Sequence, residues 1–564
     1  MKTSLSYDHY YGYAELREAL EGFAQRYPGL CTLESNCVTE KGREQFVMTV
    51  TNKETGEPLS KPGWYLDGNI HAGEVTSSMA ALHFIDVLLT GYAEDETLRR
   101  IVDRYTVYVI PRVSPDGAEV YLRSPAHLRS VDRADSPKAG GLFPADLDGD
   151  GVIRSMRVPS PYGAWKKDEA DPSRLCLRSP SDTEGVFYDL YTEGLWEPGG
   201  DEENPQPKRP DWSLDFNRNF PFGWFPEPRQ PGAGNYPLSN PECKALADFV
   251  IAHPNIGGAA IGHTSGGLLL YPPGTMPSAK AEPQDLKVLR EIAGMGKEEL
   301  GYEPLNIFDS FLSNQENYDS GAFDDWCYQC RGIPAYTVEY WDLPGKAGVP
   351  FPWGSKEPES AARKLERFEA CRAWVRENAP QYDLDWTPCE HPFFGPVEIG
   401  GLQTKFTVQN PPEAFLEAEC QKASRFHLRF LQAMPRLTVD SLSAKALGGG
   451  IYEIKAAVGN LGYLPTNLTE LARSLKLNDG VKLCIEGAEL LGGKPEEELG
   501  DLEGYSATAL SFHGNPSTLS RAKACKGLCW IVRAKPGDRI TVKASQSKAG
   551  TARQSLVLPS ESGK

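Results

Sequence analysis

A histidine and a glutamate separated by two residues are the first feature of this sequence that could do chemistry. His71 and Glu74 stand in the segment His-Ala-Gly-Glu, where an apolar stretch gives way to helical spacing. Imidazole nitrogen and carboxylate oxygen are the ligand types of catalytic zinc, which keeps three protein ligands and one open position. Taken alone, the pair is better explained as a helix N-terminus at which Glu74 meets the helix dipole.

Two further residues strengthen the metal interpretation. His263 follows the apolar stretch 256–262 and precedes a glycine-rich loop, and open α/β sheets place their sites at the carboxyl ends of strands. Glu339 stands in an apolar run between Val338 and Tyr340, where a carboxylate is costly to bury without a partner. A general base acting on a metal-activated water would have such a partner. The alternatives are a capped core histidine and a solvent-facing glutamate on an edge strand.

A second group of residues has the chemistry to hold a substrate. Asn217 and Arg218 stand in Asp-Phe-Asn-Arg-Asn-Phe, and the guanidinium fork of such an arginine suits a free carboxylate. The alternative is an ordinary surface loop. Tyr318 lies in a predicted loop from which a phenol can close over a substrate. Asp324 either lines a side-chain pocket or caps a helix.

The elements that position these residues alternate between strands and helices, which predicts an α/β sheet with helices on its faces. Beyond residue 435, short β-like runs separated by Gly, Asn and Pro predict a separate small all-β domain, a sandwich, over 436–564. Periodicity predicts helices at 12–28, directly after Glu74, at 241–252 and around 283–300, and strands at 45–52, 63–69, 105–110, 256–262 and 334–340.

Residues 121–210 differ in composition, being rich in Pro, Gly, Ser and charge. This predicts a loop-rich insertion packed over the scaffold. Within it Asp146, Asp148 and Asp150 have the spacing that opens a calcium loop of EF-hand type, although the twelfth position is Arg157. A calcium ion held with other ligands and a metal-free Asp/Gly turn both remain open.

Composition excludes several classes of function. The chain has 564 residues, which predicts more than one domain, and its net charge of −18 disfavours a nucleic-acid partner. No stretch approaches the 18 apolar residues of a membrane span, and we see no signal peptide, so we expect a cytoplasmic protein. The 12 cysteines are scattered, and Cys327 and Cys330 are interpreted as ordinary thiols.

Taken together, these residues resemble the zinc metallocarboxypeptidases of the carboxypeptidase A/B type. The resemblance spans roughly residues 8 to 385 and includes the segments Ser-Pro-Asp-Gly at 114–117 and Ser-Asn-Pro-Glu at 239–242. It also includes the long segments that begin at His263 and at Asp324. It implies a mixed central sheet with helices on both faces in a catalytic domain over 1–435.

The resemblance also assigns roles to the candidate residues. It implies that one zinc ion is bound by His71, Glu74 and His263. Asn217 and Arg218 would grip the C-terminal carboxylate of a peptide, and Glu339 would be the general base. Tyr318 would be a mobile active-site tyrosine, and Asp324 would lie at the base of the side-chain pocket and favour C-terminal Lys or Arg. Arg157, with Arg154 behind it, would be the arginine that polarises the scissile carbonyl.

The sequence departs from the digestive members of that family at two positions, Gly73 inside the His-x-x-Glu segment and Ser265 after the third predicted ligand. The resemblance implies a hydrolase that removes the last residue of a peptide. Two alternatives remain: the same zinc chemistry on bacterial cell-wall peptides or acylated amino acids, and an inactive peptide-binding relative. We further expect the insertion to narrow the groove and restrict the enzyme to short peptides. The oligomeric state is left open.

Overall fold

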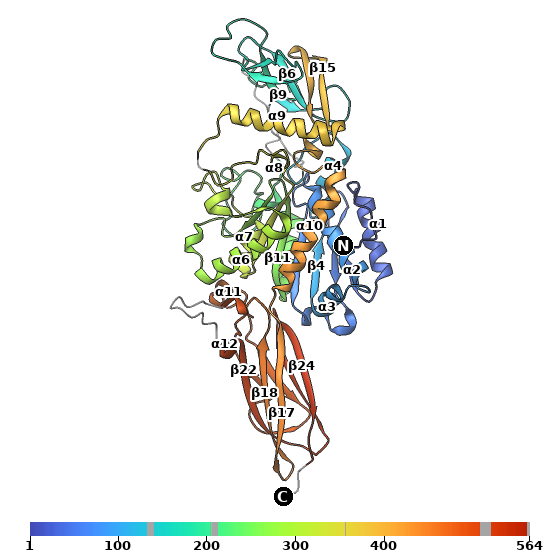
Figure 1. Cartoon of the computed structure of the whole chain (residues 1–564), viewed down its shortest axis with the longest axis vertical. Helices are drawn as coiled ribbons and strands as arrows, with labels where there is room; N and C mark the ends of the chain where they lie inside the picture. Colours follow the sequence, from blue (N-terminus) through green and yellow to red (C-terminus); the bar gives the residue numbers. More distant parts are fainter. Residues whose placement is uncertain (132–139, 204, 206–212, 356, 508–520, 561–564) are drawn as a thin grey trace.

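The computed structural model spans the whole chain and describes all residues except 132–139, 204, 206–212, 356, 508–520 and 561–564 (Figure 1). Figure 1 shows an elongated molecule with a central α/β part. A smaller sheet lies at one end of this part, and long C-terminal strands lie at the other. None of the helices in the described ranges combines the length and the apolar character that crossing a bilayer requires.

The central sheet has eight strands in the order β1-β2-β4-β3-β11-β14-β12-β13. Its middle strands β4, β3, β11 and β14 run parallel. Antiparallel pairs are β1 with β2, β2 with β4 and β12 with β14, and β12 pairs in parallel with β13. The predicted mixed sheet is therefore confirmed. The bounds are β1 Cys31–Val38, β2 Glu44–Val50, β3 Gly63–Gly68, β4 Thr106–Ile110, β11 Ile256–Thr264, β12 Leu268–Tyr271, β13 Glu303–Asn306 and β14 Ala335–Tyr340.

Helices cover both faces of this sheet because its strands are apolar on both sides. Trp64 and Leu66 of β3 face one hydrophobic core, and Tyr65 between them faces another, as the two-residue period of a strand requires. The first core is covered by α1 Tyr13–Arg26, α2 Val75–Gly91, α3 Glu96–Arg104, α6 Pro283–Leu300 and α10 Glu413–Gln432. The second core is covered by α5 Pro241–Ala252 and α7 Phe323–Arg331.

The predicted loop-rich insertion contains regular structure, which corrects that prediction in part. Four of its strands and a hairpin formed by residues 383–402 make one sheet, in the order β15-β16-β6-β9-β7-β8, in which β6 pairs with β16. Two more strands form a small separate sheet, β10-β5. The bounds are β5 Gly141–Pro144, β6 Ser155–Pro159, β7 Trp165–Lys167, β8 Leu175–Leu177, β9 Tyr188–Thr192, β10 Gly194–Glu197, β15 Asp383–His391 and β16 Gly395–Leu402. Three helices adjoin these segments: α4 Pro115–Arg123, α8 Leu343–Lys346 and α9 Ala361–Asn378.

The C-terminal residues form two four-stranded sheets, β17-β18-β22-β20 and β21-β19-β23-β24, which share one hydrophobic core. The all-β character predicted for this region is confirmed. The bounds are β17 Leu437–Gly448, β18 Ile451–Asn460, β19 Lys482–Glu486, β20 Glu489–Gly492, β21 Glu496–Glu498, β22 Cys525–Arg533, β23 Arg539–Gln546 and β24 Gly550–Val557, with two short helices, α11 Glu470–Ser474 and α12 Arg521–Ala524.

These C-terminal sheets contact the central part at the amino ends of its strands. Lys548 Nζ donates to the carbonyl oxygen of Ile256, where β11 begins, at 2.7 Å. Asp285 of α6 accepts from the backbone N–H groups of Glu470 and Leu471 at 2.6 and 3.1 Å. His263 lies at the other end of β11, so the C-terminal sheets are docked on the side of the sheet away from the predicted ligands.

Candidate metal centre and active site

The turn after β3 places His71 and Glu74 at the carboxyl edge of the sheet. Asn69 adopts a left-handed conformation with φ of 61°, and its side chain donates to the carbonyls of His71 and Ala72 at 2.6 and 3.1 Å. A side chain at Gly68 would collide with the backbone oxygen of Ser77 at 2.5 Å. The glycine therefore lets α2 begin directly over the end of β3.

The three predicted ligands converge on one point. His71 Nδ1 lies 2.9 Å from Glu74 Oε1, and His263 Nδ1 lies 3.0 Å from Glu74 Oε2. The two Nδ1 atoms face each other at 3.1 Å, and all three side chains are only 3 % exposed. Two imidazole nitrogens and a carboxylate that meet in a buried space form the donor set of catalytic zinc. The residues therefore fit the metal.

Charge and hydrogen bonding prepare these ligands for a cation. Burial alone would raise the pKa of Glu74, but the neighbouring His71 and His263 hold this pKa well below its ordinary value. Glu74 in turn raises the pKa of His263 to about 9, against the effect of burial. The cluster therefore keeps Glu74 in the ionised form that binds a cation, and a bound metal ion would take the place of the proton that His263 holds.

Asp215 joins the predicted metal ligands to the predicted substrate anchor. Its Oδ1 lies 3.0 Å from His71 Nε2 and accepts the backbone N–H of Asn217 at 2.9 Å. It thereby orients the imidazole, as carboxylates behind metal-binding histidines do, and caps the short turn η3 Phe216–Arg218. Burial would raise the pKa of Asp215, but the charges of Arg129 and His71 hold it well below its ordinary value.

Arg129 is a site residue that sequence reasoning missed. Its Nε donates to Asp215 Oδ2 at 3.0 Å, and its Nη1 lies 3.4 Å from Glu74 Oε1. Its side chain is 43 % exposed, so the guanidinium stands beside the ligand cluster and still reaches open space. The backbone is held as well, because Arg129 accepts the N–H of Ala72 through its carbonyl at 2.7 Å.

Arg157 does not belong to this cluster, which corrects the sequence prediction for the carbonyl-polarising arginine. It lies on β6 of the six-stranded sheet, where its Nε donates to Glu398 Oε2 at 2.8 Å. Its guanidinium covers the Trp386 ring at 4.3 Å, and only 3 % of the side chain is exposed. Arg154, named behind it, pairs with Asp150. The partners of both arginines are therefore outside the ligand cluster, whereas Arg129 contacts the predicted ligand Glu74.

Glu339 lies on β14 directly beside His263 in the parallel register of the two strands. Burial raises the pKa of its carboxyl to about 7, with the charge of His263 opposing that rise. Because a general base works best with a pKa near the working pH, this environment suits proton transfer close to the ligand cluster.

The predicted substrate-holding residues lie on connected elements. Asn217 Oδ1 accepts the N–H of Phe323, the first residue of α7, at 2.8 Å. Arg218 Nη2 lies 3.1 Å from Asp319 Oδ2, and its side chain is 12 % exposed. Tyr318 contacts the Phe225 ring at 5.1 Å between centroids and is partly exposed.

Asp324 is buried within a group of carboxylates. Its Oδ2 accepts from the Thr337 hydroxyl at 2.9 Å and its Oδ1 from the Asp325 N–H at 2.8 Å. Burial, followed by the charge of Asp324, raises the pKa of Asp325 to about 8. Burial likewise raises the pKa of Asp67 to about 7. Burial is the largest cause of both shifts, and the negative charge of Asp324 adds to it.

Gly73 explains one departure noted in the sequence. A Cβ atom there would meet Tyr121 Cε2 at 2.6 Å and Gln409 Nε2 at 2.7 Å. The Gly73 carbonyl also accepts from Asn410 Nδ2 at 2.7 Å. The segment that follows β16 therefore packs directly on the His-Ala-Gly-Glu turn and leaves no room for a longer side chain.

The predicted calcium site is not supported. Asp146 uses its oxygens to accept the N–H groups of Gly149 and Gly151 at 2.8 and 2.9 Å, and Asp150 pairs with Arg154. Asp146 and Asp148 do approach the carboxylate of Glu193. Glu193, however, already accepts two backbone N–H groups, those of Leu147 and Arg154. The loop is thus closed by its own hydrogen bonds.

Comparison with known proteins places this geometry in a family. The zinc carboxypeptidase family matches residues 16–150 and 182–349, and a domain family of unknown function matches 436–557. Zinc carboxypeptidase A 1 of Drosophila melanogaster is 30 % identical over 34 % of this chain and 43 % of its own length. The corresponding protein of Anopheles gambiae is 22 % identical over 60 % of this chain and 61 % of its own length.

Among solved structures, thrombin-activatable fibrinolysis inhibitor matches with 19 % identity and a TM-score of 0.42, over 66 % of this chain and 76 % of that one. The chain thus spans about two fifths to three fifths of the two curated insect relatives it matches. The family match covers more than half of the chain. The chain therefore belongs to the zinc carboxypeptidase family.

Proposed function

We propose that this chain is a zinc metallocarboxypeptidase that hydrolyses the C-terminal peptide bond of peptides. Residues 1–435 would form its catalytic domain and residues 436–564 a separate β domain. The observation that carries the proposal is the convergence of His71, Glu74 and His263 beside Glu339. A bound zinc ion would supply Lewis-acid chemistry, activating water for attack and polarising the scissile carbonyl.

Glu339 performs the proton transfers in this proposal. Its carboxylate takes a proton from the attacking water and passes it to the nitrogen of the leaving amino acid. Its place on β14, next to His263 in register, holds it at the carboxyl edge of the sheet. Its raised pKa of about 7 lets it accept and then release a proton near neutral pH.

Arg218 and Asn217 fix the end of the substrate. The guanidinium and the amide bind the free α-carboxylate, so that only the last peptide bond reaches the ligand cluster. Before substrate binds, the Arg218 guanidinium is paired with the carboxylate of Asp319 at 3.1 Å. Asp215 keeps anchor and ligands at a fixed separation because it binds both His71 and the η3 turn.

Arg129 stabilises the negative charge that develops on the carbonyl oxygen. Its two carboxylate partners, Glu74 and Asp215, hold the guanidinium in place before reaction, which is the preorganisation that makes such donors effective. Tyr318 closes over the bound peptide.

The buried carboxylates favour a basic residue at the end of the substrate. Asp324 acts on Asp67, Asp325 and Glu339, where its negative charge adds to burial in raising the pKa of each carboxyl. A Lys or Arg side chain would bring the positive charge that this region lacks. We therefore propose a preference for C-terminal Lys or Arg.

A pair of peptides that differ only at the carboxyl end tests the proposed function. The zinc-loaded protein should release one amino acid from a peptide with a free C-terminal carboxylate and none from the C-terminal amide. Glu339→Gln should abolish that release and keep bound zinc, because the substituted residue is not a ligand. Release by Glu339→Gln at the native rate, or equal cleavage of the amide, would contradict the proposal.

A further inference from the structure

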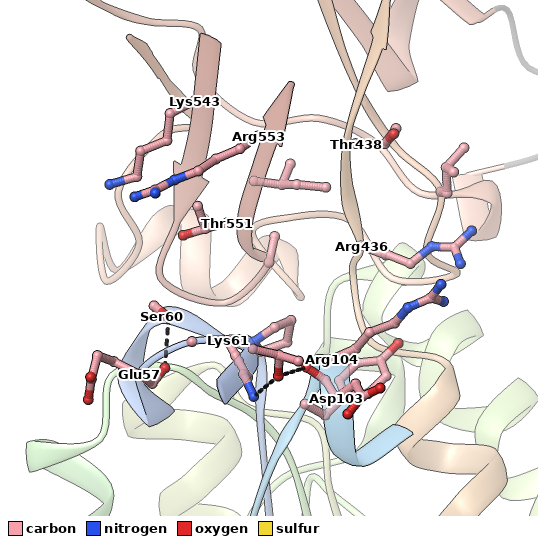
Figure 2. A pocket seen from close by; sticks show the side chains of 17 residues that line it. Glu57, Ser60, Lys61, Asp103, Arg104, Arg436, Thr438, Lys543, Thr551 and Arg553 are labelled. Carbon is pink, nitrogen blue, oxygen red and sulfur yellow. Dashed lines mark hydrogen bonds between the residues drawn. The ribbon is translucent and has the colours of Figure 1, made fainter. Parts of the chain in front are cut away.

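A cavity of about 840 Å³ lies between the central part and the C-terminal sheets. It is bounded on one side by the segment before β3 and the end of α3, and on the other by the start of β17 and by strands β23 and β24 (Figure 2). It therefore stands at the amino ends of the central strands, away from the metal ligands. Its volume is that of a site for a small molecule.

The cavity is lined by cationic side chains, although the chain as a whole has 77 acidic and 59 basic residues. Arg104, Arg436, Lys543 and Arg553 come from both parts of the molecule. Within the described ranges, no carboxylate forms an ion pair with any of these four side chains. Two carboxylates also line the cavity, those of Glu57 and Asp103. The carboxylate of Asp103 is bonded to Asn52 Nδ2 at 2.7 Å and to the Tyr92 hydroxyl at 2.9 Å.

Two of the cations form an unfavourable pair. Lys543 on β23 and Arg553 on β24 are direct cross-strand partners, and Figure 2 shows both side chains extending in the same direction. Like charges directly opposite one another destabilise a sheet. On the other side of the cavity, Arg104 and Arg436 both act electrostatically on the Tyr105 phenol. An anion bound beside Lys543 and Arg553 would relieve the repulsion between those two side chains.

A buried cation adds to this positive potential. Lys61 is 5 % exposed, and its Nζ donates to Thr51 Oγ1 at 2.8 Å, Asn52 O at 2.6 Å and Thr55 Oγ1 at 2.7 Å. All three acceptors are neutral, so none of them cancels the charge. Lys61 therefore adds an ammonium group to the lining of the cavity. Burial lowers the pKa of this group to about 8, and the negative charge of Asp103 opposes that shift.

We propose that this cavity binds a multivalent oxyanion, one that carries several phosphate or carboxylate groups. Guanidinium forks recognise such groups bidentately, and the hydroxyls of Thr438 and Thr551, which also line the cavity, can donate to further oxygens. Because the cations belong to both parts of the chain, the ligand holds the C-terminal sheets against the central part. This binding is separate from peptide hydrolysis and does not require it.

Calorimetric titration of the zinc-loaded protein at physiological salt tests the site, with inorganic triphosphate and citrate as separate probes. Higher affinity for triphosphate assigns phosphate groups, and higher affinity for citrate assigns carboxylates. The Lys543→Gln/Arg553→Gln variant should bind about tenfold or more weakly, because two charges that contact the anion are lost. The matched control, Lys535→Gln/Arg539→Gln, removes the same charge from exposed positions outside the cavity and should bind as the native protein does.

Arg104→Gln provides an independent check from the opposite wall, on an exposed residue at the end of α3. It should also weaken binding, with an unchanged unfolding temperature in the absence of ligand. Absence of binding to the native protein would overturn the proposal. So would equal weakening in both double variants, which indicates non-specific attraction. Binding that none of the cavity substitutions affects would place the anion elsewhere, for instance at the metal centre, and would likewise overturn it.

Discussion

Substitution of Arg129 tests the assignment that the sequence did not provide. In Arg129→Gln, the donor beside the ligand cluster is lost, and loss of one such donor costs about 10²–10³ in kcat, or roughly 3–4 kcal/mol. Stability should fall, because Glu74 and Asp215 are only 3 % and 11 % exposed and lose the cation that compensates their charge. Activity is therefore measured well below the unfolding temperature of the variant. Asp215 keeps its contacts with His71 and Asn217, so zinc should stay bound. The assay is kcat and KM for benzoyl-glycyl-arginine, with zinc content measured on the same samples.

Arg157→Gln is the matched control, since it removes the same charge from the arginine that the sequence suggested. The substitution breaks the bond to Glu398 at 2.8 Å and the contact with Trp386. Loss of a buried charged hydrogen bond costs about 1–3 kcal/mol, which should lower the unfolding temperature, while kcat stays unchanged. A large loss of kcat in Arg157→Gln together with native kcat in Arg129→Gln would refute the reasoning.

Three further predictions concern substrate and pH. Arg218→Gln should raise KM about 10- to 100-fold for a peptide with a free carboxylate, because a charged hydrogen bond contributes about 1.5–3 kcal/mol; an unchanged KM would count against the anchor. Asp324→Asn should lower kcat/KM for C-terminal Arg more than for C-terminal Phe, and Asp325→Asn, whose carboxylate is bonded to Gly274 N–H, serves as its control; equal losses for the two peptides would remove the pocket assignment. Burial lowers the pKa of Lys548 to about 7, so above that pH the unfolded chain binds one more proton than the folded chain does, and stability rises with pH. In Lys548→Met, the free energy of unfolding should rise with pH by about 1.4 kcal/mol less per pH unit than in the native protein. Urea unfolding of both proteins at pH 7, 8 and 9 measures this difference, and the same pH dependence in both would contradict the prediction.

The sequence predicts the central sheet well because its elements carry strong local periodicity. The helix after Glu74 and the strands around His263 and Glu339 are apolar on both faces, a pattern that only a sheet covered by helices explains. The same strands set the ligand geometry, since neighbouring parallel strands end at one edge. That is why residues as distant in sequence as Glu74 and His263 could be assigned to one site.

The features that could not be predicted depend on pairing across long stretches of sequence. The short strands of the insertion pair with one another and, through β6, with β16, which lies more than two hundred residues later. Arg129 lies in a segment without periodicity, and its role arises from contacts with Asp215 and Glu74. The Asp/Gly loop matched a calcium pattern by spacing alone, whereas its carboxylates bind their own backbone.

The zinc content of the native protein and of His263→Ala tests the central claim most directly. Both proteins are dialysed against zinc and then against metal-free buffer, and bound metal is measured by plasma mass spectrometry. The account predicts one zinc ion per native chain and none in the variant, because the buried Nδ1 that faces His71 at 3.1 Å is removed. A variant that keeps a full equivalent of zinc would contradict it.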